Sequence, residues 1–246
     1  MAKVLSVEGL VKKYGRKTVV DGLSFSMESG QITGLLGPNG AGKTTTFYMI
    51  VGFIRAGGGT IRLDGTDITT LPMYRRSRLG LSYLPQESSI FRKLSVEDNI
   101  RLVIQTRSDL DRSQRKELLE SLIADFGIGR VRRQPGYTLS GGERRRTEIA
   151  RALATSPSFL LLDEPFAGID PKAVYEIKQI IRTLSARGIG ILLTDHNVRD
   201  ALSITTCAHI ISDGRIVVSG TSQELIENPL AQEIYFGEGF RENILQ

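Results

Sequence analysis

The sequence predicts an α/β fold in which helices pack on a largely parallel sheet and a helical lobe is inserted into the chain. Short apolar runs that suit buried strands alternate with segments that suit helices. A glycine-rich loop lies between one such strand and the next helix. Residues from about 88 to 155 differ from both flanks because they are mostly polar and helix-forming. The 246 residues, 40% of them hydrophobic, are enough for a packed core.

The first third of the chain predicts strands interrupted by one helix. Segments 4–15 and 23–37 are rich in β-forming residues. We expect a helix from about Lys43 to Val51, directly after the glycine loop. Segment 59–68 contains a turn at Asp64–Gly65 and suits two further short strands.

The second half continues the alternation. The apolar runs "GLSYLP", "FLLLDEP" and "IGILLTD" suit buried strands. Between the second and the third run we expect a helix with Asp170 as its N-cap and Gly188 just past its end. Residues around Asp213–Gly214 predict a β-hairpin.

The net charge of +5 suits an anionic partner such as a nucleotide or an acidic lipid head group. No aromatic residues interleave with the arginine clusters, so we expect no nucleic-acid partner. We expect each cluster to be a solvated helix or loop face. The clusters are Arg75, Arg76 and Arg78; Arg130, Arg132 and Arg133; and Arg144, Arg145 and Arg146.

No apolar run approaches the roughly 20 residues that a membrane-spanning helix needs, and the start lacks the apolar segment of a secretory signal. The single cysteine, Cys207, excludes an internal disulfide and suits a reducing compartment. We therefore expect a cytoplasmic protein.

The glycine loop fits the phosphate-binding pattern G-x-x-x-x-G-K-[ST]. In such loops backbone N–H groups and a helix N-terminus surround the phosphates of a nucleoside triphosphate. We expect the lysine to reach the β- and γ-phosphates and the first threonine to bind Mg²⁺. The alternative is a glycine turn that only joins strand and helix. The predicted phosphate-binding residues are Gly37, Pro38, Asn39, Gly40, Ala41, Gly42, Lys43, Thr44 and Thr45.

Two adjacent carboxylates end the apolar run 159–162 and are expected at the carboxyl edge of the sheet, where α/β sheets bind ligands. Asp163 is placed to hold Mg²⁺ through its water shell, and Glu164 to polarise an attacking water as general base. A glutamate aimed at water indicates hydrolysis rather than transfer to another acceptor. The alternative is that both acids are ordinary capping or turn residues.

The segment "LSGGERRR" predicts a capping box, with Ser140 as N-cap and Glu143 three residues later. A helix N-terminus with Gly141, Gly142 and a free hydroxyl is also suited to an anion. One phosphate loop already surrounds the nucleotide from its own side. We therefore expect this second anion site to close over the γ-phosphate of another copy, in an isologous homodimer with two shared sites.

Together these motifs resemble those of the ATP-binding subunit of ABC transporters, over nearly the whole chain. The resemblance implies that Tyr14 stacks on adenine, that Gln86 is the Q-loop glutamine near Mg²⁺, and that His196 is the switch histidine at the γ-phosphate. It also implies that Asp170 belongs to the D-loop, while His209 matches no motif and is expected to be structural.

The same resemblance implies a P-loop NTPase fold: an ABC ATPase core with a mixed sheet, an N-terminal antiparallel β subdomain and the inserted helical lobe. The whole chain, 1–246, is then one domain. Its parts are the core with the β subdomain, 1–87 and 156–228; the helical lobe, 88–155; and a C-terminal tail, 229–246.

Longer strings are similar to the ATPases of lipopolysaccharide exporters, namely "YLPQESSIFRKLSVEDNI", "DEPFAGIDP", "TDHNVRDAL" and "IYFGEGF". The alternative is the ATPase of branched-chain amino-acid importers. An ABC protein that acts on ribosomes would usually carry two ATPase cassettes, but this chain has one phosphate loop of this type. A P-loop GTPase would contain an N-K-x-D segment, which is absent. A DNA-repair ATPase of the same superfamily would need a long coiled-coil insertion, which this chain also lacks.

The exporter resemblance implies a partner in the inner membrane, with this chain peripheral on its cytoplasmic face. Phe91 and Arg92 offer an apolar and a cationic group just beyond Gln86. We expect a cytoplasmic helix of the membrane subunits to dock there. The alternative is that Phe91 packs inside the lobe.

Overall fold

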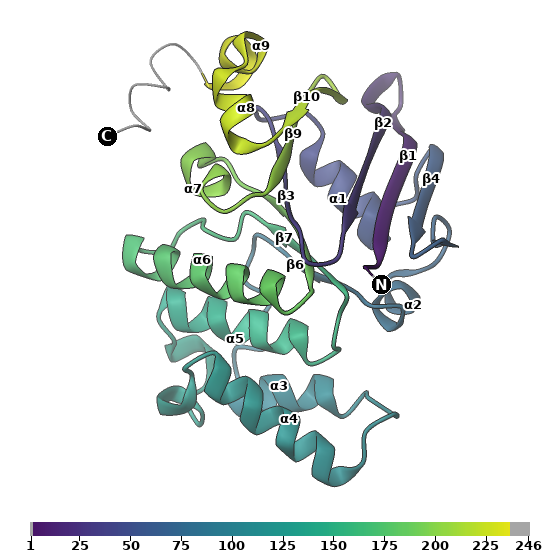
Figure 1. Cartoon of the computed structure of the whole chain (residues 1–246). Helices are drawn as coiled ribbons and strands as arrows, with labels where there is room; N and C mark the ends of the chain where they lie inside the picture. Colours follow the sequence, from purple (N-terminus) through teal and green to yellow (C-terminus); the bar gives the residue numbers. More distant parts are fainter. Residues whose placement is uncertain (1, 237–246) are drawn as a thin grey trace.

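The computed structural model describes residues 2–236 and contains two sheets (Figure 1). A mixed sheet has the order β10-β9-β3-β8-β7-β6, in which only the β9–β10 pair is antiparallel. An antiparallel sheet of order β2-β1-β4-β5 lies beside it. The strands are β1 Val4–Tyr14, β2 Lys17–Glu28, β3 Ile32–Leu36, β4 Gly58–Leu63, β5 Thr66–Asp67, β6 Leu81–Leu84, β7 Phe159–Asp163, β8 Gly190–Thr194, β9 Cys207–Ser212 and β10 Arg215–Gly220.

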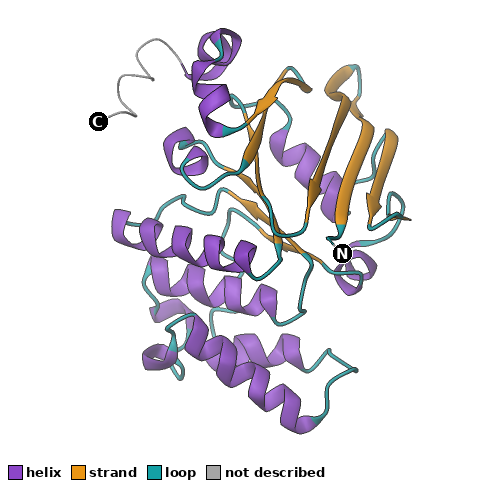
Figure 2. Ribbon diagram, viewed as in Figure 1, coloured by secondary structure: helices purple, strands orange, loops and turns teal. Residues whose placement is uncertain are grey.

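The helices divide between the sheets and a separate group. In Figure 2, α3, α4 and α5 gather below α6, away from the antiparallel sheet. The helices are α1 Lys43–Val51, α2 Met73–Arg78, α3 Val96–Ile104, α4 Arg112–Asp125, α5 Gly141–Leu153, α6 Pro171–Ala186, α7 Val198–Leu202, α8 Ser222–Glu227 and α9 Pro229–Ala231. Gly129–Val131 and Gly136–Thr138 form 3₁₀ turns, and Gln232–Phe236 forms one π-helical turn, η3.

The central strands read as continuous apolar runs because both faces of the sheet are covered. Every residue of β3, β7 and β8 is buried. On β7, Leu160 and Leu162 belong to the hydrophobic cluster shared with the helical lobe, whereas Leu161 belongs to the cluster beneath the antiparallel sheet and α1. Alternate residues of one strand thus join two cores.

The predicted fold class is confirmed: a mixed sheet, an N-terminal antiparallel sheet and an inserted group of helices. The helix over Lys43–Val51, the N-cap at Asp170 and the hairpin at Asp213–Gly214 lie where we expected them. Within residues 2–236, no helix is long and apolar enough to cross a membrane. The predicted tail, 229–246, is described only as far as Phe236, and the rest of it lies outside the described residues.

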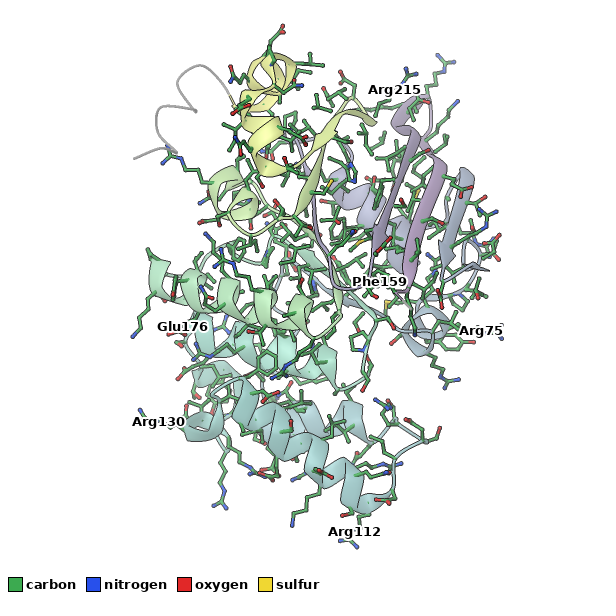
Figure 3. The ribbon with its side chains drawn as sticks, viewed as in Figure 1. Arg75, Arg112, Arg130, Phe159, Glu176 and Arg215 are labelled. Carbon is green, nitrogen blue, oxygen red and sulfur yellow. The ribbon has the colours of Figure 1, made fainter. Side chains whose placement is uncertain are left out.

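The expectation that every arginine cluster is a solvated face is wrong at Arg76. Figure 3 shows Arg75, Arg112 and Arg130 at the periphery, but Arg76 is only 2% exposed. Its guanidinium donates to the carbonyl oxygens of Met49 and Ile50 at the end of α1, both at 2.6 Å, and to those of Leu71 and Thr69, both at 2.8 Å. A cation at a helix C-terminus also interacts favourably with the helix dipole. Arg76 therefore anchors α1, the helix that follows the phosphate loop.

We predict that Arg76→Met lowers the free energy of unfolding by about 2–4 kcal/mol, because several buried carbonyl groups lose their donor. Urea unfolding followed by circular dichroism measures the loss. Arg78→Met is the matched control on the same helix, because Arg78 is exposed, and it should change stability by less than about 0.5 kcal/mol. Equal losses in the two variants would contradict the anchoring role of Arg76.

Candidate nucleotide-binding site

The loop between β3 and α1 is shaped by glycines that no other residue could replace. Gly37 has φ 150°, and a Cβ there would lie 2.1 Å from the carbonyl oxygen of Ile211. Gly42 has φ 105°, and a Cβ there would lie 2.7 Å from the carbonyl oxygen of Val19. The loop backbone therefore packs closely against neighbouring strands just before α1 begins.

Lys43 is the first residue of α1 and is only 8% exposed. Its ammonium donates to the carbonyl oxygens of Gly37 at 2.7 Å and Pro38 at 3.0 Å. Burial lowers the pKa of this ammonium, and the charges of Glu164 and Asp163 oppose that shift. The phosphate loop thus holds the Lys43 ammonium against its own backbone, where a bound polyphosphate would need a positive charge.

A cavity of about 170 Å³ lies over the loop. Thr44 is exposed and Thr45 half-buried at its edge. Among the described residues 2–236, Glu164 is the only lining residue from outside β2, the loop and α1, so the cavity joins the phosphate loop to the end of β7. The lining residues are Val19, Asn39, Gly40, Gly42, Lys43, Thr44, Thr45 and Glu164.

Four parallel strands bring the other predicted residues to the same edge of the sheet. β3, β8, β7 and β6 are consecutive neighbours, so their carboxyl ends lie in a row. Glu164 follows β7 directly, His196 follows β8, and Gln86 follows β6. Side chains that are 78 and 32 residues from Glu164 in the sequence thereby reach its carboxylate.

The Glu164 carboxylate has a polar side chain on each side, and the one from Gln86 donates a hydrogen bond to it. Its Oε2 lies 2.5 Å from Nε2 of Gln86 and 3.0 Å from Nδ1 of His196. The backbone at Glu164 has φ 47°, a left-handed conformation that is strained for a residue with a Cβ. Its N–H donates to the carbonyl of Thr194 at 2.8 Å, which holds the strained residue against β8.

Asp163 is 2% exposed, and its Oδ2 accepts a hydrogen bond of 3.2 Å from the hydroxyl of Tyr83. Burial raises the pKa of this carboxyl. Its other oxygen, Oδ1, is buried and has no hydrogen-bond partner among the described residues. A buried acceptor of this kind costs free energy unless a ligand or water satisfies it.

These residues fit a Mg²⁺ ion bound mainly by phosphate oxygens and water. Within residues 2–236, no three His, Cys, Asp or Glu side chains come together as a metal cage. The chain instead offers the unpaired Oδ1 of Asp163 and the exposed hydroxyl of Thr44. Mg²⁺ sites in phosphate-binding proteins are typically of this sparse kind.

A family model for ABC transporters matches residues 20–167. The chain belongs to the ABC transporter family. A probable ABC transporter ATP-binding protein of Azorhizobium caulinodans is 53% identical over 96% of this chain and 84% of its own length. The lipopolysaccharide export system ATP-binding protein LptB of Acidithiobacillus ferridurans is 51% identical over 98% of this chain and 100% of its own length. A solved ATP-binding cassette of an ABC transporter, in its ADP conformation, has a TM-score of 0.85 at 26% identity and covers 96% of this chain and 99% of that chain.

As an ABC ATPase, the chain binds nucleotide and hydrolyses ATP. The resemblance inferred from the motifs is confirmed. The phosphate loop, the β7 carboxylates and residues 139–143, which we call the signature segment, therefore belong to one cassette.

The signature segment forms the predicted capping box. Oγ of Ser140 accepts from the N–H of Glu143 at 3.3 Å, and the Glu143 carboxylate accepts from the N–H of Ser140 at 2.9 Å. A Cβ on Gly142 would lie 2.9 Å from Cβ of Ala173, so the glycine allows α5 to pack closely on α6. None of these residues lines the cavity over the phosphate loop.

Tyr14 and Asp170 also lie outside that cavity lining, as do the loop residues Gly37, Pro38 and Ala41. The side chain of Asp170 caps α6, accepting from the N–H of Ala173 at 3.0 Å. Tyr14 is 51% exposed at the end of β1, and the ammonium of Lys12 lies 5.2 Å from the centre of its ring. An exposed ring on the antiparallel sheet remains available for stacking.

Sequence reasoning missed Arg145, which it assigned to a solvated face. Arg145 is 6% exposed and donates to the carbonyls of Pro85 at 3.0 Å and Asp163 at 3.4 Å. Its partner Glu148 accepts from the hydroxyl of Ser88 and from the N–H groups of Ser89 and Ile90. The only signal in the sequence was the i, i+3 spacing of Arg145 and Glu148 on one helix face. Both side chains fasten α5 to the end of β7 and to the segment after β6, beside Glu164 and Gln86.

Proposed function

We propose that this ABC ATPase powers lipopolysaccharide export, on the cytoplasmic face of an inner membrane. Relatives with this printed function are 50% or 51% identical over at least 96% of the chain, and this supports the exporter over the branched-chain amino-acid importer. The chain would supply the energy for extracting the lipid from the membrane. Its helical lobe would span 88–155, the core with its β subdomain 1–87 and 156–228, and the tail 229–246.

One observation carries the chemical part of the proposal: the Glu164 carboxylate is held between Gln86 and His196 at the edge of the cavity that contains Lys43. In the proposed reaction Glu164 takes the proton of the attacking water, while His196 and Gln86 orient it. Lys43 and the loop amides hold the phosphates, and Tyr14 holds the adenine. Mg²⁺ near Thr44, Gln86 and Asp163 would neutralise charge on the phosphates.

We predict that Glu164→Gln still binds ATP but that its turnover falls by a factor of roughly 10² or more, because the amide keeps the shape of the side chain and removes the base. Fluorescent-nucleotide titration and phosphate release measure the two quantities. Glu117→Gln, at an exposed position on α4, is the matched control and should behave as wild type. Normal turnover in Glu164→Gln would show that Glu164 is not the base.

The position of the signature residues supports a shared site. Ser140, Gly141 and Gly142 begin α5 but lie outside the cavity of their own chain. A second copy, related by a two-fold axis, can bring them to the γ-phosphate held by Lys43. ATP would then hold the positively charged faces of the two copies together, and its hydrolysis would weaken the contact between them. Asp170 lies close to the signature segment, because Cγ2 of its neighbour Ile169 is 3.2 Å from where a Cβ on Gly141 would lie.

Mixing two inactive variants tests this homodimer. We predict that Ser140→Arg and Lys43→Ala each abolish ATP hydrolysis, but that their mixture regains partial activity, because one site of the mixed dimer keeps both Lys43 and Ser140. Phosphate release at a series of mixing ratios measures the regain, and each variant mixed with itself is the control. If native mass spectrometry detects heterodimers but the mixture regains no ATPase activity, the prediction that one intact shared site is enough for hydrolysis is wrong.

A second cavity suits the membrane partner. It measures about 600 Å³ and opens between α1, α2, β6 and α5, with a lining that includes Tyr48, Phe53, Met73, Tyr83 and Arg151. Phe91 lies at Arg151, whose guanidinium carbon is 5.2 Å from the centre of the ring, and is 48% exposed. Arg92 is exposed beside it. We infer that a cytoplasmic helix of the membrane subunits docks here, since half of the Phe91 surface is open rather than packed in the lobe.

We predict that Phe91→Ala weakens binding of the membrane subunits by about 2 kcal/mol, on the order of thirtyfold, while ATP binding by the isolated chain is unchanged. Arg92→Glu should weaken binding most at low salt if its partner is acidic. Co-purification from detergent extract and nucleotide titration measure the two effects. A lower thermal midpoint of Phe91→Ala with unchanged partner binding would instead identify Phe91 as a packing residue.

A further inference from the structure

The C-terminal π-helical turn, η3, places one tyrosine hydroxyl against the catalytic edge of the sheet. Tyr235 lies about 40 residues beyond β8, yet its hydroxyl donates to the carbonyl oxygen of Asp195 at 3.3 Å. Its ring packs against the same hydrophobic cluster as Leu36, the last residue before the phosphate loop. Neither the phosphate-loop motif nor the switch motif includes this residue.

Asp195 is the residue on which the position of His196 depends. It is 1% exposed, and its carboxylate accepts from the N–H of Phe166 at 3.3 Å and from the N–H of Asn197 at 2.8 Å. The carbonyl that Tyr235 holds belongs to the peptide bond joining Asp195 to His196. The side chain of His196, by contrast, is 58% exposed and has little packing to orient it. Its orientation therefore depends on the backbone before it.

The Tyr235 hydroxyl is shielded from water at this edge of the sheet. Burial raises its pKa to about 12, so the hydroxyl keeps the proton that it donates to the carbonyl oxygen of Asp195. π-helical turns occur frequently at functional sites.

We propose that the Tyr235 hydroxyl is a positioning group for ATP hydrolysis, which fixes the Asp195–His196 peptide and so keeps the His196 ring at Glu164. The hydroxyl does not touch the reacting atoms. It acts through His196, whose Nδ1 lies 3.0 Å from the Glu164 carboxylate. The C-terminal segment is by this contact part of the catalytic apparatus.

The test is Tyr235→Phe, which keeps the ring and removes only the hydroxyl, in the untagged full chain. We predict that kcat for ATP falls roughly three- to tenfold, the size expected for one hydrogen bond, while KM changes by less than about twofold. Tyr74→Phe is the matched control, because it removes an exposed hydroxyl on α2 far from His196 in the sequence, and it should leave both constants unchanged.

A spectroscopic measurement separates positioning from general destabilisation. The chain has only two histidines, His196 and His209, so their ring signals can be followed individually by NMR. In Tyr235→Phe we expect the His196 signals to shift and those of His209, buried between β3 and β10, to stay. His196→Ala supplies the double-mutant cycle: in that background the loss of the hydroxyl should have no further effect on single-turnover hydrolysis.

Three results would overturn the proposal. The first is an unchanged kcat in Tyr235→Phe. The second is a lower kcat accompanied by movement of both histidine signals and a lower thermal midpoint, which indicates general destabilisation. The third is an additive effect in the His196→Ala background. A wild-type chain without ATPase activity would refute the ATPase itself, so the wild-type measurement distinguishes that failure from failure of the Tyr235 proposal.

Discussion

The register of four parallel strands is the constraint on which the catalytic edge depends. Leu84 pairs with Leu162, Leu162 with Leu193, and Asp163 with Thr194. Gln86 lies two residues after Leu84, and Glu164 lies two residues after Leu162. Both side chains therefore emerge at the same level of the sheet. His196 emerges one residue further along than Glu164. A slip of one residue would turn each side chain to the other face of its strand. The buried leucines of both cores fix the register, and the register fixes the geometry around Glu164.

Assembling these groups is unfavourable for stability, and the surrounding structure offsets it locally. Lys43, Asp163, Asp195 and Arg145 are all buried charges, and Glu164 has a left-handed backbone. Backbone groups satisfy many of these buried charges. Carbonyl oxygens accept hydrogen bonds from Lys43 and Arg145, and N–H groups donate to the Asp195 carboxylate. Two atoms of these charged side chains are left without a partner in the described chain, Oδ1 of Asp163 and Nε of Arg145. Polar groups held at unfavourable cost are characteristic of a site shaped for a ligand rather than for stability.

The sequence predicted what local chemistry determines. The phosphate loop needs glycine backbone freedom, the buried strands need continuous apolar residues, and the α5 capping box needs Ser140 and Glu143; each is visible within a few residues. Arg76, Arg145 and Tyr235 were not predictable in this way. Both arginines bind carbonyl oxygens brought from distant segments, so their burial has no local pattern, and charge alone suggested solvated faces. Tyr235 meets Asp195 only because η3 folds back onto the sheet. Tertiary contacts with backbone atoms are the part that motifs do not encode.

The contacts of α5 connect the proposed shared nucleotide site with the proposed docking surface. The helix begins at Ser140, which in the proposed dimer meets the nucleotide of the other copy. Five residues later Arg145 binds the carbonyls of Pro85 and Asp163, beside Gln86 and Glu164. One turn further, Glu148 holds the backbone of Ser89 and Ile90, directly before Phe91. A shift of α5 must therefore move or break contacts at both places. Because coupling between two binding sites is reciprocal, a membrane partner that holds Phe91 in one position also biases the signature helix, and with it ATP-driven closure.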